Sequence, residues 1–191
     1  MRELRRQHVE AVAGRRDVHR FYFLDETGLR LDYCRRYGRA PGGRRVGGAV
    51  PLRRGQSLTL IGALGVRGLK GVQLLEGALN QRGFAYYVVR LLAPQLRRGD
   101  VLVLDNLRVH HVPGLHQWLA RRGIELLFLP PYSPDFTPVE QAWSKLKTQL
   151  RRAQARTQQA LTEALHAAID WITAHDAKAW FNHCGYHVHR S

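Results

Sequence analysis

The sequence predicts a single domain of the α/β class with a largely parallel set of strands. Three short and continuously apolar runs, at residues 20–26, 101–106 and 124–129, are typical of strands buried on both faces. Segments with the apolar spacing of helices lie between and after these runs, and such alternation is typical of parallel strands joined by helices. A length of 191 residues is ordinary for one domain with a substantial core.

Four further segments can be assigned in the first half of the chain. Residues 35–54 are rich in Gly, Pro and Arg, which predicts a basic loop or loose hairpin. Residues 57–64 are expected to form a strand, and another strand is expected near 72–75. Within 80–98, apolar side chains recur at helical spacing, which predicts one continuous helix.

The second half of the chain alternates strands and helices more regularly. The expected elements are, in order, a strand at 101–106, a helix at 112–122, a strand at 124–129, a rigid turn-rich loop at 130–138, a helix that begins near Val139 and a last helix at 157–173. On the helix near Val139, Trp143, Leu146 and Leu150 share one stripe, which predicts the face that packs on the core.

The chain is strongly basic. It has 30 Lys and Arg residues against 15 Asp and Glu residues, which gives a formal net charge of +15. Only four of the basic residues are Lys, and Arg is the better bidentate ligand for phosphate. A genome rich in G and C would also raise the Arg content. A surplus of this size on a small protein nevertheless favours a polyanionic partner, which we expect to be DNA.

The composition argues against a membrane or secreted protein. No stretch approaches the roughly 20 apolar residues of a membrane span. The N-terminal segment is charged from its start and lacks the apolar core of a secretory signal. Cys34 and Cys184 are too few for a disulfide framework. We therefore expect a protein of the reducing cytoplasm, associated with the nucleoid.

Acidic residues end two of the buried strands and begin a helix. Asp25 and Asp105 each follow an apolar run, and Glu140 lies in the first turn of the helix after the turn-rich loop. Functional groups of open α/β sheets gather at the carboxyl ends of adjacent strands, so the three acids are expected to meet there. Three close carboxylates repel one another unless cations lie between them, and hard oxygen ligands select Mg²⁺ or Mn²⁺. Two such ions would support in-line phosphoryl transfer.

The two aspartates also have a purely structural interpretation. Asp25 and Asp105 could each belong to a turn at the end of a strand. Glu26 adjoins Asp25, and neighbouring strand residues point to opposite faces of a sheet. Only one of these two acids is therefore expected to reach a shared site.

Glu140 has a structural alternative as well. With Thr137 as the N-cap and Pro138 in the first turn, Glu140 could complete a capping box, which needs no catalytic role. Asp135 is a rival for the third acidic position, although an Asp next to Pro is usually a turn former.

Three segments resemble the catalytic motifs of DDE-type transposases in the mariner superfamily, particularly its bacterial insertion-sequence branch. The last motif is resembled by 129–147, LPPYSPDFTPVEQAWSKLK, and this similarity is highly specific. The second motif is resembled by 101–111, VLVLDNLRVHH, and the first by 23–31, FLDETGLRL, with the basic loop that follows. The tail at 180–186 is also similar to endings in this branch, so the resemblance extends over about residues 20–186.

The resemblance implies a ribonuclease-H-like fold with a mixed central sheet flanked by helices. It implies that Asp25, Asp105 and Glu140 are catalytic and hold two Mg²⁺ or Mn²⁺ ions. It further implies a DNA transposase that cuts at terminal inverted repeats, joins the freed 3′-hydroxyls to target DNA at TA dinucleotides, and acts as a homodimer in a synaptic complex. The alternatives are a non-catalytic DNA-binding remnant of a transposase and a host nuclease of the same fold that acts on RNA–DNA hybrids.

Two features depart from the family pattern. Thr137 stands where Asn is usual. Residues 1–19 form an extension too short for the helix-turn-helix that recognises transposon ends in this family. The predicted organisation is therefore this extension followed by a catalytic domain at 20–191 that includes the C-terminal helix. The product of an upstream reading frame is expected to carry the helix-turn-helix, and a truncated remnant is the alternative.

Basic side chains near the acids are candidates for contact with DNA. His110 follows Asp105 closely, and Lys147 and Arg151 share the helix face of Glu140. A hydrogen-bonding or surface role for His110 and a solvated helix face for the two cations are the simpler interpretations. The densest basic cluster is expected to clamp a DNA strand and consists of Arg35, Arg36, Arg39, Arg44 and Arg45.

Overall fold

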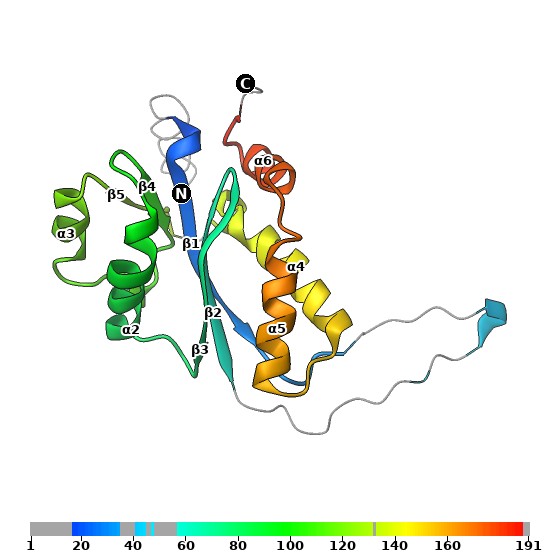
Figure 1. Cartoon of the computed structure of the whole chain (residues 1–191). Helices are drawn as coiled ribbons and strands as arrows, with labels where there is room; N and C mark the ends of the chain where they lie inside the picture. The colour runs from blue at the N-terminus through cyan, green and yellow to red at the C-terminus, as the bar shows by residue number, and fades with distance from the viewer. Residues whose placement is uncertain (1–16, 35–40, 45–46, 48–56, 132, 189–191) are drawn as a thin grey trace.

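A five-stranded sheet separates two layers of helices in the computed structural model, which describes residues 17–34, 41–44, 47, 57–131 and 133–188 (Figure 1). The strands are β1 (Phe21–Leu29), β2 (Leu58–Gly65), β3 (Gly68–Glu76), β4 (Val101–Leu104) and β5 (Glu125–Phe128). Their order across the sheet is β3-β2-β1-β4-β5.

The sheet is mixed. β1 pairs in parallel with β4, and β4 in parallel with β5, whereas β2 is antiparallel to both β1 and β3. The expectation of a largely parallel set of strands is therefore wrong for half of the sheet. The reason lies in the connection between β2 and β3, which consists of Val66 and Arg67 alone. Two residues can reverse a chain into an antiparallel hairpin but cannot form the crossover that parallel strands need.

Each face of the sheet is covered by its own set of helices (Figure 1). One layer contains α2 (Gln81–Tyr86), the π-helical segment η3 (Tyr87–Leu92), the 3₁₀ turn η4 (Ala93–Gln95) and α3 (Leu115–Arg121). The other contains α4 (Val139–Ala153), α5 (Gln158–Ile169) and α6 (Ala174–His183). Short 3₁₀ turns complete the described elements: η1 (Val18–Arg20), η2 (Pro41–Gly43), η5 (Arg108–His110) and η6 (Pro134–Phe136).

Two separate hydrophobic clusters fill the spaces between the layers. On β1, Phe21 and Phe23 belong to the cluster under α4, α5 and α6, whereas Leu24 belongs to the cluster under α2 and α3. This alternation confirms that β1 is covered on both faces, as its continuous apolar run predicts. It also sends Asp25 towards α4 and Glu26 towards the α2 layer, so the expectation that these acids diverge is confirmed.

Two helix predictions need correction. The segment 80–98 is helical without a break from Gln81 to Gln95, but its geometry changes from α to π to 3₁₀ and it ends before Leu96, because Pro94 lacks an amide hydrogen and its ring clashes with the preceding turn. The last expected helix, 157–173, ends at Ile169, and a further helix, α6, begins after Thr173. Thr173 is the N-cap of α6 and forms a capping box with Asp176. Thr173, which the sequence pattern places at the end of one helix, thus caps the start of the next.

The start of α4 differs from the expected capping box. Pro138 precedes the helix with φ −64° and ψ −17°, and no side chain caps the first turn. Thr137 contributes its carbonyl, which accepts the Glu140 amide at 3.2 Å, while its buried side chain lines a pocket. The capping-box interpretation of Glu140 is therefore wrong for this structure, because the Glu140 amide bonds to the carbonyl of Thr137 and, among the described residues, no side chain caps this turn.

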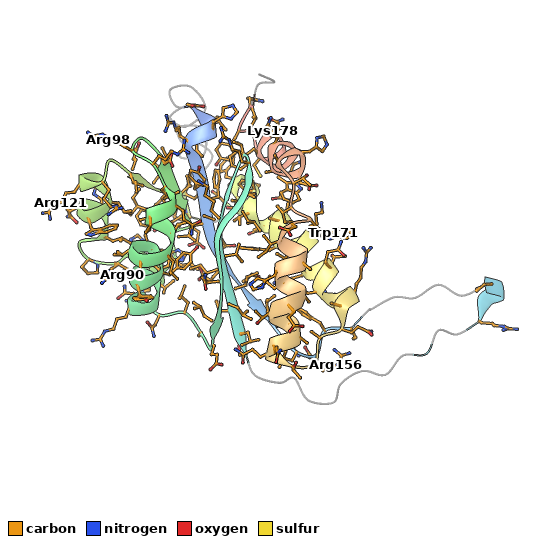
Figure 2. All side chains as sticks on the ribbon, viewed as in Figure 1. Arg90, Arg98, Arg121, Arg156, Trp171 and Lys178 are labelled. Atoms are coloured by element: carbon orange, nitrogen blue, oxygen red, sulfur yellow. The ribbon has the colours of Figure 1, made fainter. Side chains whose placement is uncertain are left out.

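Positive charge is spread over both helical layers. Figure 2 labels Arg90, Arg98 and Arg121 on the α2–α3 side, and Arg156 and Lys178 on the α4–α6 side. The charge surplus alone therefore does not identify a binding face. None of the helices in the described part of the chain combines the length and apolar character needed to cross a bilayer.

The docking of α4 gives a prediction for stability. Leu146 is fully buried in the middle of α4, so Leu146→Ala should lower the free energy of unfolding by about 2–5 kcal/mol. Leu107 is 50% exposed, so the same change at Leu107 should lower it by about 0.5 kcal/mol or less. Urea unfolding of the two variants measures the difference, and equal losses would contradict the described packing of α4.

Candidate active site

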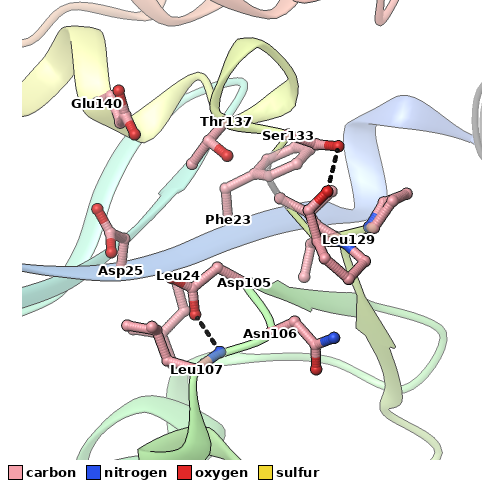
Figure 3. A pocket seen from close by; sticks show the side chains of 13 residues that line it. Phe23, Leu24, Asp25, Asp105, Asn106, Leu107, Leu129, Ser133, Thr137 and Glu140 are labelled. Carbon is pink, nitrogen blue, oxygen red and sulfur yellow. Dashed lines mark hydrogen bonds between the residues drawn. The ribbon is translucent and has the colours of Figure 1, made fainter. Parts of the chain in front are cut away.

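The three predicted acids line one pocket of about 370 Å³. Asp25 comes from β1, Asp105 follows β4 directly, and Glu140 lies in the first turn of α4. In Figure 3 the side chains of Asp25 and Glu140 extend toward each other across this pocket. The structure therefore brings together three acids that are far apart in the sequence, beside the carboxyl end of β4.

The pocket forms where the parallel pairing of β1 stops. Leu24 pairs with Leu104, the last residue of β4, whereas β1 itself continues through Leu29 with β2 as its only paired neighbour. Asp25 is expected at the end of its strand, but it lies within β1, at the first position after the pairing with β4 stops. The early end of β4 opens space beside β1, and Asp105 turns into this space.

Mutual repulsion and burial raise the pKa of two of these carboxyl groups. For Asp25, burial is the main cause, and the charges of Glu26 and Asp105 add to it, so its pKa rises from the ordinary 3.8 to about 7. For Glu140, burial and then the charge of Asp105 raise the pKa. Both shifts mean that the negative form of these two acids is disfavoured in the folded protein.

This set of donors fits a divalent cation of the Mg²⁺ class. It supplies carboxylate oxygens, which are hard ligands, in a place where added positive charge would relieve repulsion. The side chains do not form a tight cluster by themselves, because no three acidic, His or Cys residues in the described ranges are grouped closely enough to hold a metal ion. Asp25, Asp105 and Glu140 are the residues that would share such an ion.

Asp105 forms an ion pair with His110. Its Oδ1 accepts the Leu107 amide at 3.1 Å and lies 2.6 Å from Nδ1 of His110. Burial alone would raise the pKa of Asp105, but His110 and the Leu107 amide together lower it below its ordinary value. The contact with His110 is a close ion pair and not a well-aligned hydrogen bond, since its Nδ1 lacks a partner in suitable geometry.

His110 joins Asp105 to Glu26. Its ring is fully buried, packs on Phe84 with centroids 4.6 Å apart, and places Nε2 2.9 Å from Oε2 of Glu26. Burial by itself lowers the pKa of His110, but the two carboxylates outweigh it and raise the pKa to about 9, so the ring is cationic at neutral pH. The prediction that His110 contacts DNA conflicts with this burial, because the side chain has no exposed surface.

A second pocket of about 460 Å³ shares Asp25 and Glu140 with the first. Lys147 and Arg151 line it, so the expectation that they share the helix face of Glu140 agrees with the structure. Lys147 Nζ donates to the Thr27 hydroxyl, and burial followed by the charge of Arg151 lowers its pKa. The guanidinium of Arg151 lies over the Tyr33 ring, 5.4 Å from its centroid. A cationic groove therefore continues from the acids along α4.

The predicted basic clamp lies almost entirely outside the described residues. Arg44 is described and exposed. The remaining members, Arg35, Arg36, Arg39 and Arg45, fall in segments of which the structure says nothing, so the clamp stays a prediction.

Trp143 contacts the site in a way that the sequence pattern does not reveal. The sequence places it on the apolar stripe of α4, and it is indeed only 3% exposed. Its indole Nε1 also donates to Oδ2 of Asp25 at 3.1 Å. The contact of Glu26 with His110 is likewise absent from the sequence predictions, although the period-two alternation of β1 places Glu26 on the opposite face from Asp25.

Comparisons with known proteins identify the family and the fold. The family described as "DDE superfamily endonuclease" matches residues 20–162. Among curated proteins there is no significant match.

Several solved structures of Mos1 transposase have the same fold. The Mos1 paired-end complex with the left transposon end aligns with a TM-score of 0.74 and 17% identity, over 94% of this chain and 56% of that chain. The Mos1 mariner paired-end complex with Mg aligns with a TM-score of 0.69 and 19% identity, over 97% and 61%. The catalytic domain of Mos1 mariner transposase aligns with a TM-score of 0.67 and 14% identity, over 96% and 84%.

The chain thus spans little more than half of the paired-end transposase chains but most of the isolated catalytic domain. The expected ribonuclease-H-like fold, a mixed sheet flanked by helices, is confirmed by this likeness. Because the family match extends over well more than half of the residues, the chain belongs to the DDE superfamily endonucleases.

Proposed function

We propose that residues 20–191 are the catalytic domain of a DNA transposase of the bacterial insertion-sequence branch of the mariner superfamily. The observation that carries the proposal is the meeting of Asp25, Asp105 and Glu140 in one pocket of a DDE endonuclease fold. Acids from two strands and a helix gain nothing in stability from such proximity, as the raised pKa values of Asp25 and Glu140 indicate. Binding of Mg²⁺ or Mn²⁺ would relieve the repulsion between these carboxylates.

The proposed reaction has two successive phosphoryl transfers. Water attacks a phosphodiester at the transposon end and breaks its bond to the 3′-oxygen, which leaves as a 3′-hydroxyl. That hydroxyl then attacks a phosphodiester of the target at a TA dinucleotide, forms a new phosphodiester bond, and displaces the 3′-oxygen of the target strand, which leaves as a 3′-hydroxyl. Two bound cations would activate the attacking oxygen and stabilise the leaving oxygen.

The chain itself would bind, orient and neutralise. Asp25, Asp105 and Glu140 supply the carboxylates, and the buried ion pairs of His110 hold Asp105 in place. Lys147 and Arg151 lie next to the acids and are suited to bind a backbone phosphate beside the scissile one.

The assembly is also part of the proposal. The Mos1 structures that this fold resembles are paired-end and strand-transfer complexes. We therefore infer a homodimer that holds two DNA ends at the nucleoid. Recognition of the terminal inverted repeats is assigned to a helix-turn-helix unit in the same polypeptide or in the product of an upstream frame.

The central prediction concerns the three acids. Asp25→Asn, Asp105→Asn and Glu140→Gln should each lower Mg²⁺-dependent strand nicking by at least about 10²-fold, because amides are poor ligands for Mg²⁺. Glu163→Gln, an exposed acid on α5, is the matched control and should nick like the wild type. A gel assay on labelled duplexes measures the rates. Unchanged rates in all three variants would show that these acids are not the ligands. A wild type that binds DNA but does not nick it would be a non-catalytic remnant, and a preference for RNA–DNA hybrids would favour a host nuclease.

The raised pKa of Asp25 predicts that replacing this acid stabilises the protein, by an amount that depends on pH. The folded state favours the protonated acid, so stability is lost as pH rises from about 4 through about 7. Asp25→Asn removes this loss and should raise the unfolding free energy by about 1–3 kcal/mol at pH 8 in EDTA, with a smaller gain at pH 5. Asp170→Asn, an exposed acid at the end of α5, should have little effect at either pH. Urea unfolding at both pH values tests this, and a gain that is not larger at pH 8 contradicts it.

The cationic groove predicts the salt dependence of DNA binding. Lys147→Ala and Arg151→Ala should each weaken binding to duplexes of any sequence and reduce the slope of log K against log salt by about 0.9, the loss of one phosphate contact. Lys178→Ala on the exposed surface of α6 should change neither quantity. Fluorescence anisotropy from 50 to 200 mM salt gives the slopes. If Lys178→Ala reduces the slope as much as the groove variants, the binding face lies elsewhere.

A further inference from the structure

Trp143 and Gly62 form a pair on the α4 side of the sheet, directly beside Asp25. Gly62 on β2 is the residue that pairs with Asp25 across the antiparallel ladder. Trp143 is buried above this position, and its indole N–H reaches Oδ2 of Asp25 at 3.1 Å. The ring therefore rests on one strand while its polar atom contacts the neighbouring strand.

The close approach of the indole depends on the absence of a side chain at Gly62. A Cβ atom built at this position would lie 3.1 Å from Cη2 of Trp143 and 3.2 Å from Cγ2 of Val72. Both distances are tighter than ordinary van der Waals contact, so either the ring or the neighbouring strand would have to move. The pairing of β2 with β3 is also irregular between Ile61 and Ala63, on either side of Gly62.

The geometry points to Trp143 as a positioning residue for Asp25, with Gly62 providing the space that it needs. The indole N–H holds Oδ2 of the carboxylate within the pocket that Glu140 and Asp105 also line. Because Trp143 and Glu140 lie on the same helix, three residues apart, the docking that makes this hydrogen bond also places Glu140 over the pocket. This inference rests on the proposed function, since it concerns the geometry of the proposed ligands.

A neutral donor suits this position. An indole N–H can donate but cannot accept, and it carries no charge, so it orients Asp25 without competing for the cation that the acids would bind. The residues that orient metal-binding carboxylates typically contribute 10- to 100-fold to metal affinity or activity when they are changed. An ordinary core tryptophan would contribute to stability alone.

The test separates the N–H from the bulk of the ring. Trp143→Phe removes the donor and keeps an aromatic ring, and site-specific replacement of Trp143 by 3-benzothienylalanine keeps the shape and replaces the N–H by sulfur. Both variants should bind Mn²⁺ about 10- to 100-fold more weakly by isothermal titration calorimetry without DNA, and should lower kcat for nicking with little change in KM for DNA. Trp180→Phe on α6, partly buried against the same cluster, is the matched control and should leave Mn²⁺ affinity and kcat unchanged.

Gly62→Ala tests the second half of the inference. It should weaken Mn²⁺ binding in the wild-type background, because the added methyl group displaces the indole. In the Trp143→Phe background it should have little further effect on Mn²⁺ binding and a smaller effect on stability, because the shorter ring no longer reaches the new methyl group. Equal effects in the two backgrounds would show that Gly62 acts independently of Trp143.

The outcomes separate this inference from the proposed function. If the wild type binds Mn²⁺ through Asp25 and the benzothienylalanine variant binds it equally well, Trp143 is only a core residue, and the proposed function stands. If the wild type shows no Mn²⁺ binding that Asp25→Asn weakens, the proposed function is overturned, and the positioning role is overturned with it.

Discussion

Asp25 is an acid held where a negative charge is unfavourable, and much of the surrounding structure serves to keep it there. It lies on the central strand β1, directly after Phe23 and Leu24, which belong to opposite cores, and burial with two nearby acids raises its pKa to about 7. An uncompensated carboxylate in such a place opposes folding. The two large hydrophobic clusters that sandwich β1 must supply enough stability to outweigh it. Strain of this kind is expected at functional sites and rarely elsewhere.

Asp25 and Asp105 are contacted from opposite faces of the sheet by two different kinds of side chain. On the α2 side, the cationic His110 connects Asp105 to Glu26, and its burial against Phe84 holds the ring in place. On the α4 side, the neutral indole of Trp143 contacts Asp25. Asp105 is therefore partly neutralised within the protein, whereas Asp25 is oriented without being neutralised. The negative form is disfavoured at Asp25 and Glu140, which face each other.

The sequence predicts the parts of this arrangement that depend on local pattern. Continuous apolar runs mark β1, β4 and β5 because both faces of these strands are covered, and period-two alternation separates Asp25 from Glu26. What could not be predicted depends on contacts between distant segments. The burial of His110 requires Phe84 from α2, and the Trp143 hydrogen bond requires a glycine on β2. Local signals also mislead, as at Thr137, whose carbonyl oxygen and not its hydroxyl accepts the Glu140 amide.

The distribution of charge around Asp25 and Glu140 links DNA and cation in the function that we propose. A DNA phosphate attracted by Lys147 and Arg151 must approach these two acids, because all four side chains line the same pocket. Without a cation the acids repel the phosphate, and the two basic side chains only partly offset the repulsion. A cation held by the acids reverses the sign of this interaction, so each partner strengthens the binding of the other, and the strengthening is equal in both directions. The free protein is then a weak site for either partner alone, and the complete site forms only when acids, cation and DNA backbone are together.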